Sequence, residues 1–253
     1  MNFFSELSAR NYPLFVFGGL SLIGAIVMMI LSWTSTTQVL GINAFIKPFK
    51  FFLSTTIFVW SMGWYLHYLD SPLTVISYQW TVIITLSFEL IWITFKAWNG
   101  ELSHFNGSTS FNALMFSIMG LAISIMTLYT LYIGILFFQS PIDLSPSYLW
   151  GIRLGILCFV IFAFQGGLMG AQLSHTVGAP DGGPGLPLVN WSTQWGDLRI
   201  AHFVGMHALQ ILPILGFYAF GSARSIIVFS VIYFGICMAV FIQAMMKTPL
   251  IRM

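Results

Sequence analysis

The sequence predicts an all-α integral membrane protein, a helical bundle with about seven transmembrane helices. Of its 253 residues, 58% are hydrophobic and 17% are aromatic, whereas only 6% are charged, and the mean hydropathy is +0.89. These values exceed the apolar share of soluble domains, so most of the surface must face lipid. A net charge of +2 from so few ionisable groups provides no basic face for nucleic acid.

Seven apolar segments are long enough to cross about 30 Å of hydrocarbon, which takes about 20 helical residues. Pro48 stands in the first turn of the second segment, where proline is well tolerated, and Pro213 predicts a kink in the sixth. No internal repeat of fixed period is present, so the inverted-repeat architecture of many secondary transporters has no support. We predict a single transmembrane domain over residues 1–253. The predicted spans lie near residues 13–33, 48–69, 72–97, 111–138, 147–171, 199–220 and 224–246.

An odd number of spans sorts the connections between them into two sets on opposite faces of the membrane. The connections after the first, third and fifth spans share what we call the polar face, whereas the other face receives short links. Most Lys and Arg residues lie on the polar face, which favours a cytoplasmic location for it. The polar face is predicted to hold Lys47, Glu101, His104, Asn106, His175, Asp181, Asp197 and Arg199.

Two ionisable residues are predicted to lie at matched depth inside the bundle. Glu89 precedes the polar-face end of the third span by about eight residues, or roughly 12 Å, and His207 lies about as far into the sixth. A carboxylate and an imidazole within hydrocarbon should face inward, where they pair or bind a ligand. Gln165 falls near the same level in the fifth span. We therefore predict one cavity that opens to the polar face, although Glu89 and His207 could also serve only as hydrogen-bonded structural groups.

His202 and His207 are five residues apart, about 140° around a helix, which is not the spacing of a zinc-binding HExxH helix. A single metal takes both only if the helix is distorted, and two separate roles fit equally well. We predict Glu89, His202 and His207 as catalytic residues, and the same three with His104 as metal ligands. The predicted cofactor-binding residues are His104, His175, Lys50, Arg199, Asp181 and Asp197.

The connection before the sixth span has an unusual composition. The ten residues 178–187, GAPDGGPGLP, contain four glycines and three prolines but one charge, which favours a fixed loop over the cavity rather than a flexible linker. An ordinary surface loop is the alternative. Asp197 stands at the N-cap position of the sixth span, and capping alone would explain it. Arg199 in the first turn opposes the helix dipole, which predicts an anionic partner from a carboxylate or a ligand.

Four strings along the chain carry a resemblance to a known family. They are KPFKF at 47–51, SHFN at 103–106, HTVGAPDGGPGLP at 175–187 and GDLRIAHFVGMHALQILP at 196–213. They resemble the segments of a bacterial family of hypothetical polytopic membrane proteins with about seven spans, over most of the chain. The resemblance implies that these segments belong together in a bacterial cytoplasmic (inner) membrane protein. It assigns no catalytic residue.

The polar residues favour a metal-dependent enzyme, a membrane hydrolase or oxidoreductase, that acts on a lipophilic substrate. The alkaline ceramidase and progestin-receptor group is similar in outline, but its helix motif is HxxxH, whereas the spacing here is HxxxxH. A divalent metal with three protein ligands and a water would activate hydrolysis of a lipid amide or ester. The alternatives are a haem- or quinone-binding electron-transfer protein with His207 as axial ligand, and a proton-coupled transporter. Membrane lipid and a lipophilic small molecule are the expected partners.

Overall fold

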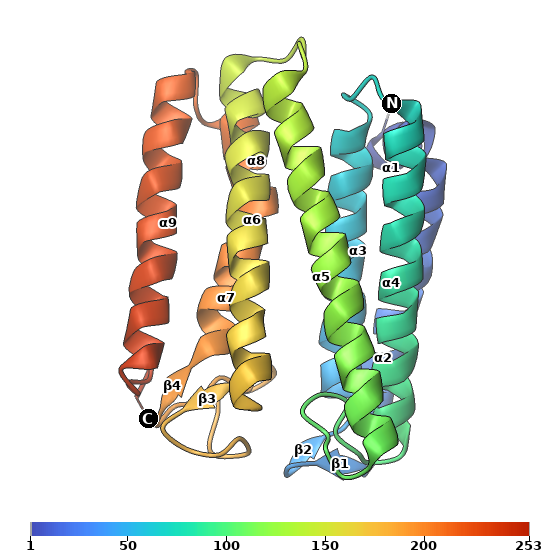
Figure 1. The fold of residues 1–253 in the computed structure, drawn as a ribbon, viewed down its shortest axis with the longest axis vertical. Helices are drawn as coiled ribbons and strands as arrows, with labels where there is room; N and C mark the ends of the chain where they lie inside the picture. The colour runs from blue at the N-terminus through green and yellow to red at the C-terminus, as the bar shows by residue number, and fades with distance from the viewer. Residues whose placement is uncertain (1, 253) are drawn as a thin grey trace. The chain divides into compact units, whose positions relative to one another are not determined.

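The structure is a computed structural model that describes residues 2–252, and the chain in it divides into two compact units. The units comprise residues 1–126 and 127–253, and the boundary between them falls inside helix α5, Ser110–Gln139 (Figure 1). The prediction of a single transmembrane domain stays a prediction. Within residues 2–252, β structure is limited to two short antiparallel pairs and an isolated bridge.

The first unit is built from helices that pack around α3. The side chain of Asn11 accepts a hydrogen bond from the backbone N–H of Leu14, so it caps α2 directly after α1 ends. At Gly24, an added Cβ would lie 2.5 Å from the ring of Phe52, so glycine is required for this close approach of α2 and α3. The elements are α1 (Phe3–Arg10), α2 (Tyr12–Thr34), β1 (Gln38–Val39), β2 (Ile42–Asn43), α3 (Ile46–Leu66), α4 (Pro72–Trp98) and the first part of α5.

The second unit is built around α6, which contacts α7, α8 and α9. The pair β3–β4 joins the two ends of the connection 173–197, with Thr176 opposite Asp197. This pairing closes the connection into a loop at the end of α6. The elements are the second part of α5, α6 (Pro146–Gln172), β3 (Thr176–Val177), β4 (Gly196–Asp197), α7 (Leu198–Met206), α8 (Ala208–Tyr218) and α9 (Ala223–Met245).

The predicted sixth span consists of two helices, α7 and α8, with His207 between them. The carbonyl of His207 accepts hydrogen bonds from the backbone N–H groups of Gln210 and Ile211, both at 3.0 Å, which forms a tight turn. Pro213, where we predicted a kink, lies inside α8. Because a proline ring crowds the carbonyl four residues earlier, here that of Leu209, the distortion occurs on its N-terminal side.

Within residues 2–252, six helices are long and apolar enough to cross a membrane, so the chain is an integral membrane protein of the all-α class. Helix α3 is 21 residues long but less hydrophobic, and it does not belong to this set. In the first unit, the β1–β2 pair and the connection 99–109 lie at one end of the helices, and in the second unit β3 and β4 lie at one end (Figure 1). The six helices are Tyr12–Thr34, Pro72–Trp98, Ser110–Gln139, Pro146–Gln172, Leu198–Tyr218 (α7 and α8 together) and Ala223–Met245.

Candidate functional site

The first unit brings together Glu89 and His104, two of the predicted site residues. Nε2 of His104 lies 3.7 Å from Oε1 of Glu89, and the two side chains are 18% and 11% exposed. The connection 99–109 folds back toward α4 to reach this position, and the indole N–H of Trp92 holds it by donating to the carbonyl of Ser103 at 3.1 Å. His104 is therefore held inside the unit, against the end of α4, rather than solvated on a loop.

The second nitrogen of the His104 ring also has a partner. Nδ1 lies 3.1 Å from Oγ of Ser103, a residue to which the sequence pattern assigns no role. Three phenylalanine rings surround the imidazole, with centroids 5.7 Å away for Phe51, 6.2 Å for Phe105 and 5.9 Å for Phe116. The imidazole thus bridges a carboxylate and a hydroxyl within an aromatic enclosure, an arrangement that adjacency in sequence alone does not reveal.

Lysine side chains add positive charge to this site. Lys47 lies close enough to Glu89 to interact electrostatically, and its ammonium is 5.8 Å from the ring of Phe51. Lys50, a predicted cofactor-binding residue, is half-buried in the same first turns of α3. Lys96, near the end of α4, instead forms an ion pair with Glu101. Lys47 was predicted on the polar face but not in the site.

In the second unit, Asp181 organises the start of the connection 173–197. Its Oδ1 accepts hydrogen bonds from the hydroxyl of Ser174 and the backbone N–H of Thr176, both at 3.0 Å, and its Oδ2 lies 2.7 Å from Nδ1 of His175. The backbone N–H of His175 donates to both oxygens. The glycine- and proline-rich loop is therefore tied down at its one carboxylate. Its placement over a cavity stays a prediction.

The hydrogen bonds to Asp181 change its pKa. Burial by itself would raise the pKa of this carboxyl, but the hydrogen bonds and charge of His175 and the hydrogen bond from Thr176 hold the pKa well below its ordinary value. A carboxyl whose pKa is lowered on folding stabilises the folded loop at every pH above its unfolded value, and this stabilisation is lost as the pH falls below that value.

Acidification is expected to open the loop around Asp181. The backbone N–H groups of His175 and Thr176 should keep constant hydrogen-exchange protection down to about pH 4, the ordinary pKa of an aspartate. Below it, protection should fall by up to about tenfold per pH unit, since one proton is taken up on opening. Hydrogen exchange at pH 6, 4 and 3 would measure this, with Asp181→Asn as the control, whose protection should not change with pH through this group because it has no carboxyl to titrate. Constant protection down to pH 3 in the wild type would contradict the assignment.

Asp197 and Arg199 fasten the other end of the same loop. Oδ1 of Asp197 accepts from the backbone N–H of Arg199 at 3.0 Å and from its Nε at 2.9 Å, and Oδ2 accepts from Nη2 at 2.6 Å. Oδ2 also accepts from the backbone N–H of Ser192 at 2.8 Å. Both predictions for this pair are confirmed, because Asp197 caps α7 and Arg199 has an anionic partner. Their contacts hold the loop, and their predicted binding of a cofactor stays a prediction.

His202 and His207 have different partners. Nδ1 of His202 lies 2.6 Å from the carbonyl oxygen of Phe162 on α6. Nδ1 of His207 lies 3.2 Å from Oε1 of Gln210, and its ring packs against Phe203 with centroids 4.4 Å apart. The sequence allowed the two histidines either to bind one metal together or to have separate roles. Because their partners differ, this arrangement favours separate roles. The prediction that His207 and Glu89 line one cavity stays a prediction, since they belong to different units.

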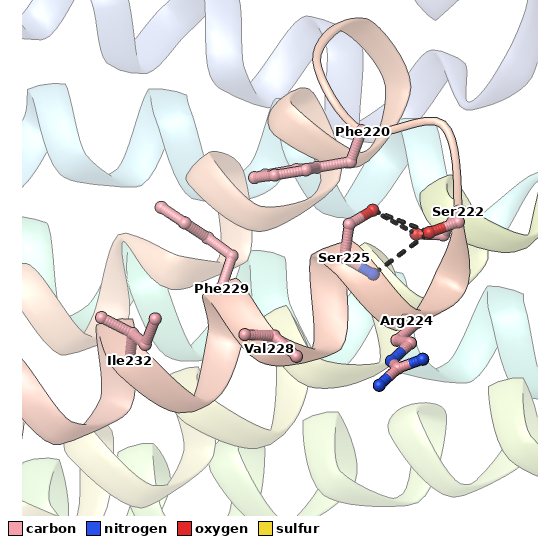
Figure 2. A pocket seen from close by; sticks show the side chains of 7 residues that line it. All are labelled: Phe220, Ser222, Arg224, Ser225, Val228, Phe229 and Ile232. Atoms are coloured by element: carbon pink, nitrogen blue, oxygen red, sulfur yellow. Dashed lines mark hydrogen bonds between the residues drawn. The ribbon is translucent and has the colours of Figure 1, made fainter.

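No three His, Cys, Asp or Glu side chains among the described residues are grouped so that they could hold a metal ion. The second unit has a groove of about 460 Å³ at the start of α9, away from β3 and β4 (Figures 1 and 2). Its lining is mostly apolar and contains none of the predicted site residues. The groove is lined by Phe220, Ser222, Arg224, Ser225, Val228, Phe229 and Ile232 (Figure 2).

Comparison of the chain with known protein families, with curated proteins and with solved structures finds no match. The arrangement with the fullest set of reactive groups is that of Glu89, His104 and Ser103 in the first unit.

Proposed function

We propose that the protein is an integral membrane enzyme that uses Glu89 and His104 as an acid–base pair on a lipophilic substrate. The observation that carries the proposal is the approach of His104 Nε2 to within 3.7 Å of the buried Glu89 carboxylate. A carboxylate inside a membrane span is costly and is commonly retained for function. Its contact with an imidazole brings together two groups that can accept and release protons.

The contacts of His104 define its chemical role. When the Nε2–H faces Glu89, the unprotonated Nδ1 accepts the hydrogen bond from the hydroxyl of Ser103, 3.1 Å away. The imidazole then takes up a proton at Nδ1 while the carboxylate stabilises the resulting positive charge. This arrangement suits a general base that activates a hydroxyl or a water for attack on a carbonyl. The protonated imidazole then returns the proton to the leaving group.

The surroundings favour a lipid ester or amide as the substrate. The imidazole lies among Phe51, Phe105 and Phe116, which favour an apolar molecule, and Lys47 lies near the carboxylate, where it adds positive charge to the site. Substrate would enter from the bilayer, because the site lies at the end of membrane-crossing helices. Metal-dependent hydrolysis would need ligands in addition to Glu89 and His104, and it stays a prediction from sequence.

The proposal includes the membrane arrangement predicted from sequence. Helix α3 is proposed as the seventh span, because its 21 residues extend about 31 Å and it packs along α2 and against α4. We further propose a bacterial cytoplasmic membrane, with the polar face toward the cytoplasm as the distribution of Lys and Arg favours.

The test is hydrolysis of a panel of fatty acyl p-nitrophenyl esters and anilides by the protein in liposomes. Glu89→Gln and His104→Gln keep the side-chain size but remove the proton exchange, and each is expected to lower kcat by about 10²–10⁴-fold. Asp70→Asn is the matched control, since Asp70 is an exposed carboxylate of the same unit and takes part in no ion pair among the described residues. This control should stay within about twofold of the wild type.

Thermal unfolding of each variant in detergent would separate a loss of chemistry from a loss of folding. Activity that survives in both Glu89→Gln and His104→Gln would exclude the acid–base pair. A wild type that hydrolyses no member of the panel would exclude ester and amide hydrolysis as the reaction.

A further inference from the structure

The groove at the start of α9 changes character along its length. Its volume of about 460 Å³ is within the usual range for sites that hold small molecules. Two serines and Arg224 line one end, and apolar side chains as far as Ile232 line the rest (Figure 2). Arg224 and Ile232 are eight residues apart, or about 12 Å along the helix. The groove therefore suits an elongated molecule with one polar end and one apolar end.

Arg224 is the charged group of this groove, and it has no ion-pair partner within residues 2–252. The second unit contains three carboxylate side chains, those of Asp143, Asp181 and Asp197. Asp181 and Asp197 pair with other residues at the 173–197 loop, and Asp143 takes part in no ion pair among the described residues. A guanidinium carries its charge throughout the physiological pH range, so Arg224 favours an anion from outside the chain.

The two serines beside Arg224 bond to each other and do not take the place of an anion. The hydroxyl of Ser225 donates to the carbonyl of Ser222 at 2.8 Å, and Oγ of Ser222 accepts from the backbone N–H of Ser225 at 3.2 Å. These bonds cap α9 and fix the first turn, which carries Arg224. The N-terminus of the helix adds partial positive charge at the same place. The polar end of the groove is thus positive, and its complement is a negatively charged group.

The apolar end of the groove determines the rest of the occupant. Val228 and Ile232 are 52% and 56% exposed, and they belong to a helix that is long and apolar enough to cross a membrane. Exposed apolar side chains on such a helix contact acyl chains. Arg224 precedes them on the same helix, so a lipid whose chain lies against Val228 and Ile232 brings its headgroup to the guanidinium.

We propose that this groove binds a membrane phospholipid of net negative charge. Its phosphate contacts Arg224, whose planar guanidinium matches the geometry of phosphate oxygens. One acyl chain lies along α9 against the apolar lining. The proposed site is in the second unit and is independent of the acid–base pair in the first.

The test measures binding of dioleoylphosphatidylglycerol to the purified full-length protein in non-ionic detergent, by native mass spectrometry. Dioleoylphosphatidylcholine has the same acyl chains but no net charge, and glycerophosphoglycerol has the same headgroup but no acyl chains. The wild type is expected to bind the anionic lipid about three- to tenfold more tightly than phosphatidylcholine, as expected for one partly exposed charged contact. Added salt should reduce this preference, because it screens the charges. Glycerophosphoglycerol is expected to bind much more weakly than the whole lipid.

Two pairs of variants locate the site. Arg224→Gln removes the charge and should abolish the preference for the anionic lipid, whereas Arg252→Gln, at an exposed arginine outside the groove, should keep it. Val228→Trp fills the apolar end and should weaken binding of the anionic lipid by about tenfold, equivalent to the loss of contact for two methylene groups. Val231→Trp is its control, because Val231 lies on the same helix, is 66% exposed and does not line the groove. Thermal unfolding without lipid would show that each variant is folded.

The outcomes are distinct. Equal affinity of the wild type for the two lipids would overturn the proposal, as would no binding of either. Glycerophosphoglycerol that binds as tightly as the whole lipid would overturn the assignment to a lipid and indicate a site for a free anion. An Arg224→Gln or Val228→Trp variant that binds like the wild type would exclude this groove. The esterase panel tests the first unit separately, so the failure of one proposal leaves the other intact.

Discussion

Asp197→Asn is expected to lower the free energy of unfolding by about 3–5 kcal/mol, which is the cost of removing one charged partner from a buried ion pair. Asp197 is 1% exposed and neutralises Arg199 through both of its oxygens. The amide cannot balance the guanidinium charge, and its NH2 group would replace an oxygen that accepts from Arg199 or from Ser192. The cap of α7 and the end of the 173–197 loop should therefore loosen together.

Equilibrium unfolding in mixed detergent micelles would measure this loss. The matched control is Asp143→Asn, an exposed aspartate with no ion pair among the described residues, which should change the free energy of unfolding by at most about 0.5 kcal/mol. A loss below about 1 kcal/mol at Asp197 would show that the pair contributes no more than an exposed salt bridge.

Gly151→Leu is expected to lower the free energy of unfolding by about 3 kcal/mol by forcing α6 away from α8. A Cβ at Gly151 would lie 2.6 Å from the backbone carbonyl oxygen of Leu212 and 2.8 Å from Cα of Pro213. These are backbone atoms, so no change of side-chain rotamer relieves the clash. The larger leucine side chain must separate the two helices.

Gly167→Leu is the matched control, because it lies on the same helix and a Cβ there would meet nothing within 4 Å. It should unfold within about 0.5 kcal/mol of the wild type, apart from the small difference in helix propensity. If the two variants lost similar amounts of unfolding free energy, the effect would come from the change of glycine to leucine itself and not from the close contact of α6 with α8.

The positions of the helices could be predicted from the sequence because hydropathy is a sum over neighbouring residues. The predicted spans at 72–97, 111–138 and 147–171 each end within a residue of helices Pro72–Trp98, Ser110–Gln139 and Pro146–Gln172. The sequence predicted a kink from Pro213, which lies inside α8, but it did not predict the interruption at His207. The predicted count of seven spans exceeds by one the number of helices with clear membrane-spanning hydropathy in the described part of the chain.

The candidate site was predicted in part. The depth of Glu89 in its span indicated a functional carboxylate. Its contact with His104 arises because the connection 99–109 folds back toward α4, and the hydrophobic periodicity of the sequence does not predict such a fold. Lys47 and Ser103 received no predicted role in the site, since their roles depend on which side chains lie opposite them in space. Gln165 has a buried Oε1 without a hydrogen-bond partner among the described residues, which likewise depends on where its neighbours lie.

The sequence by itself determined that the protein lies in a membrane and the approximate bounds of most of its long helices, and it placed Asp197 at a capping position, because each of these depends on residues close together in the chain. The tertiary structure decided which polar groups meet. Glu89 pairs with His104, and the ring of His202 donates to Phe162, a residue of another helix. Such pairings depend on distances of a few ångströms between segments remote in sequence, and those distances are set by the packing of the helices and the folding of their connections.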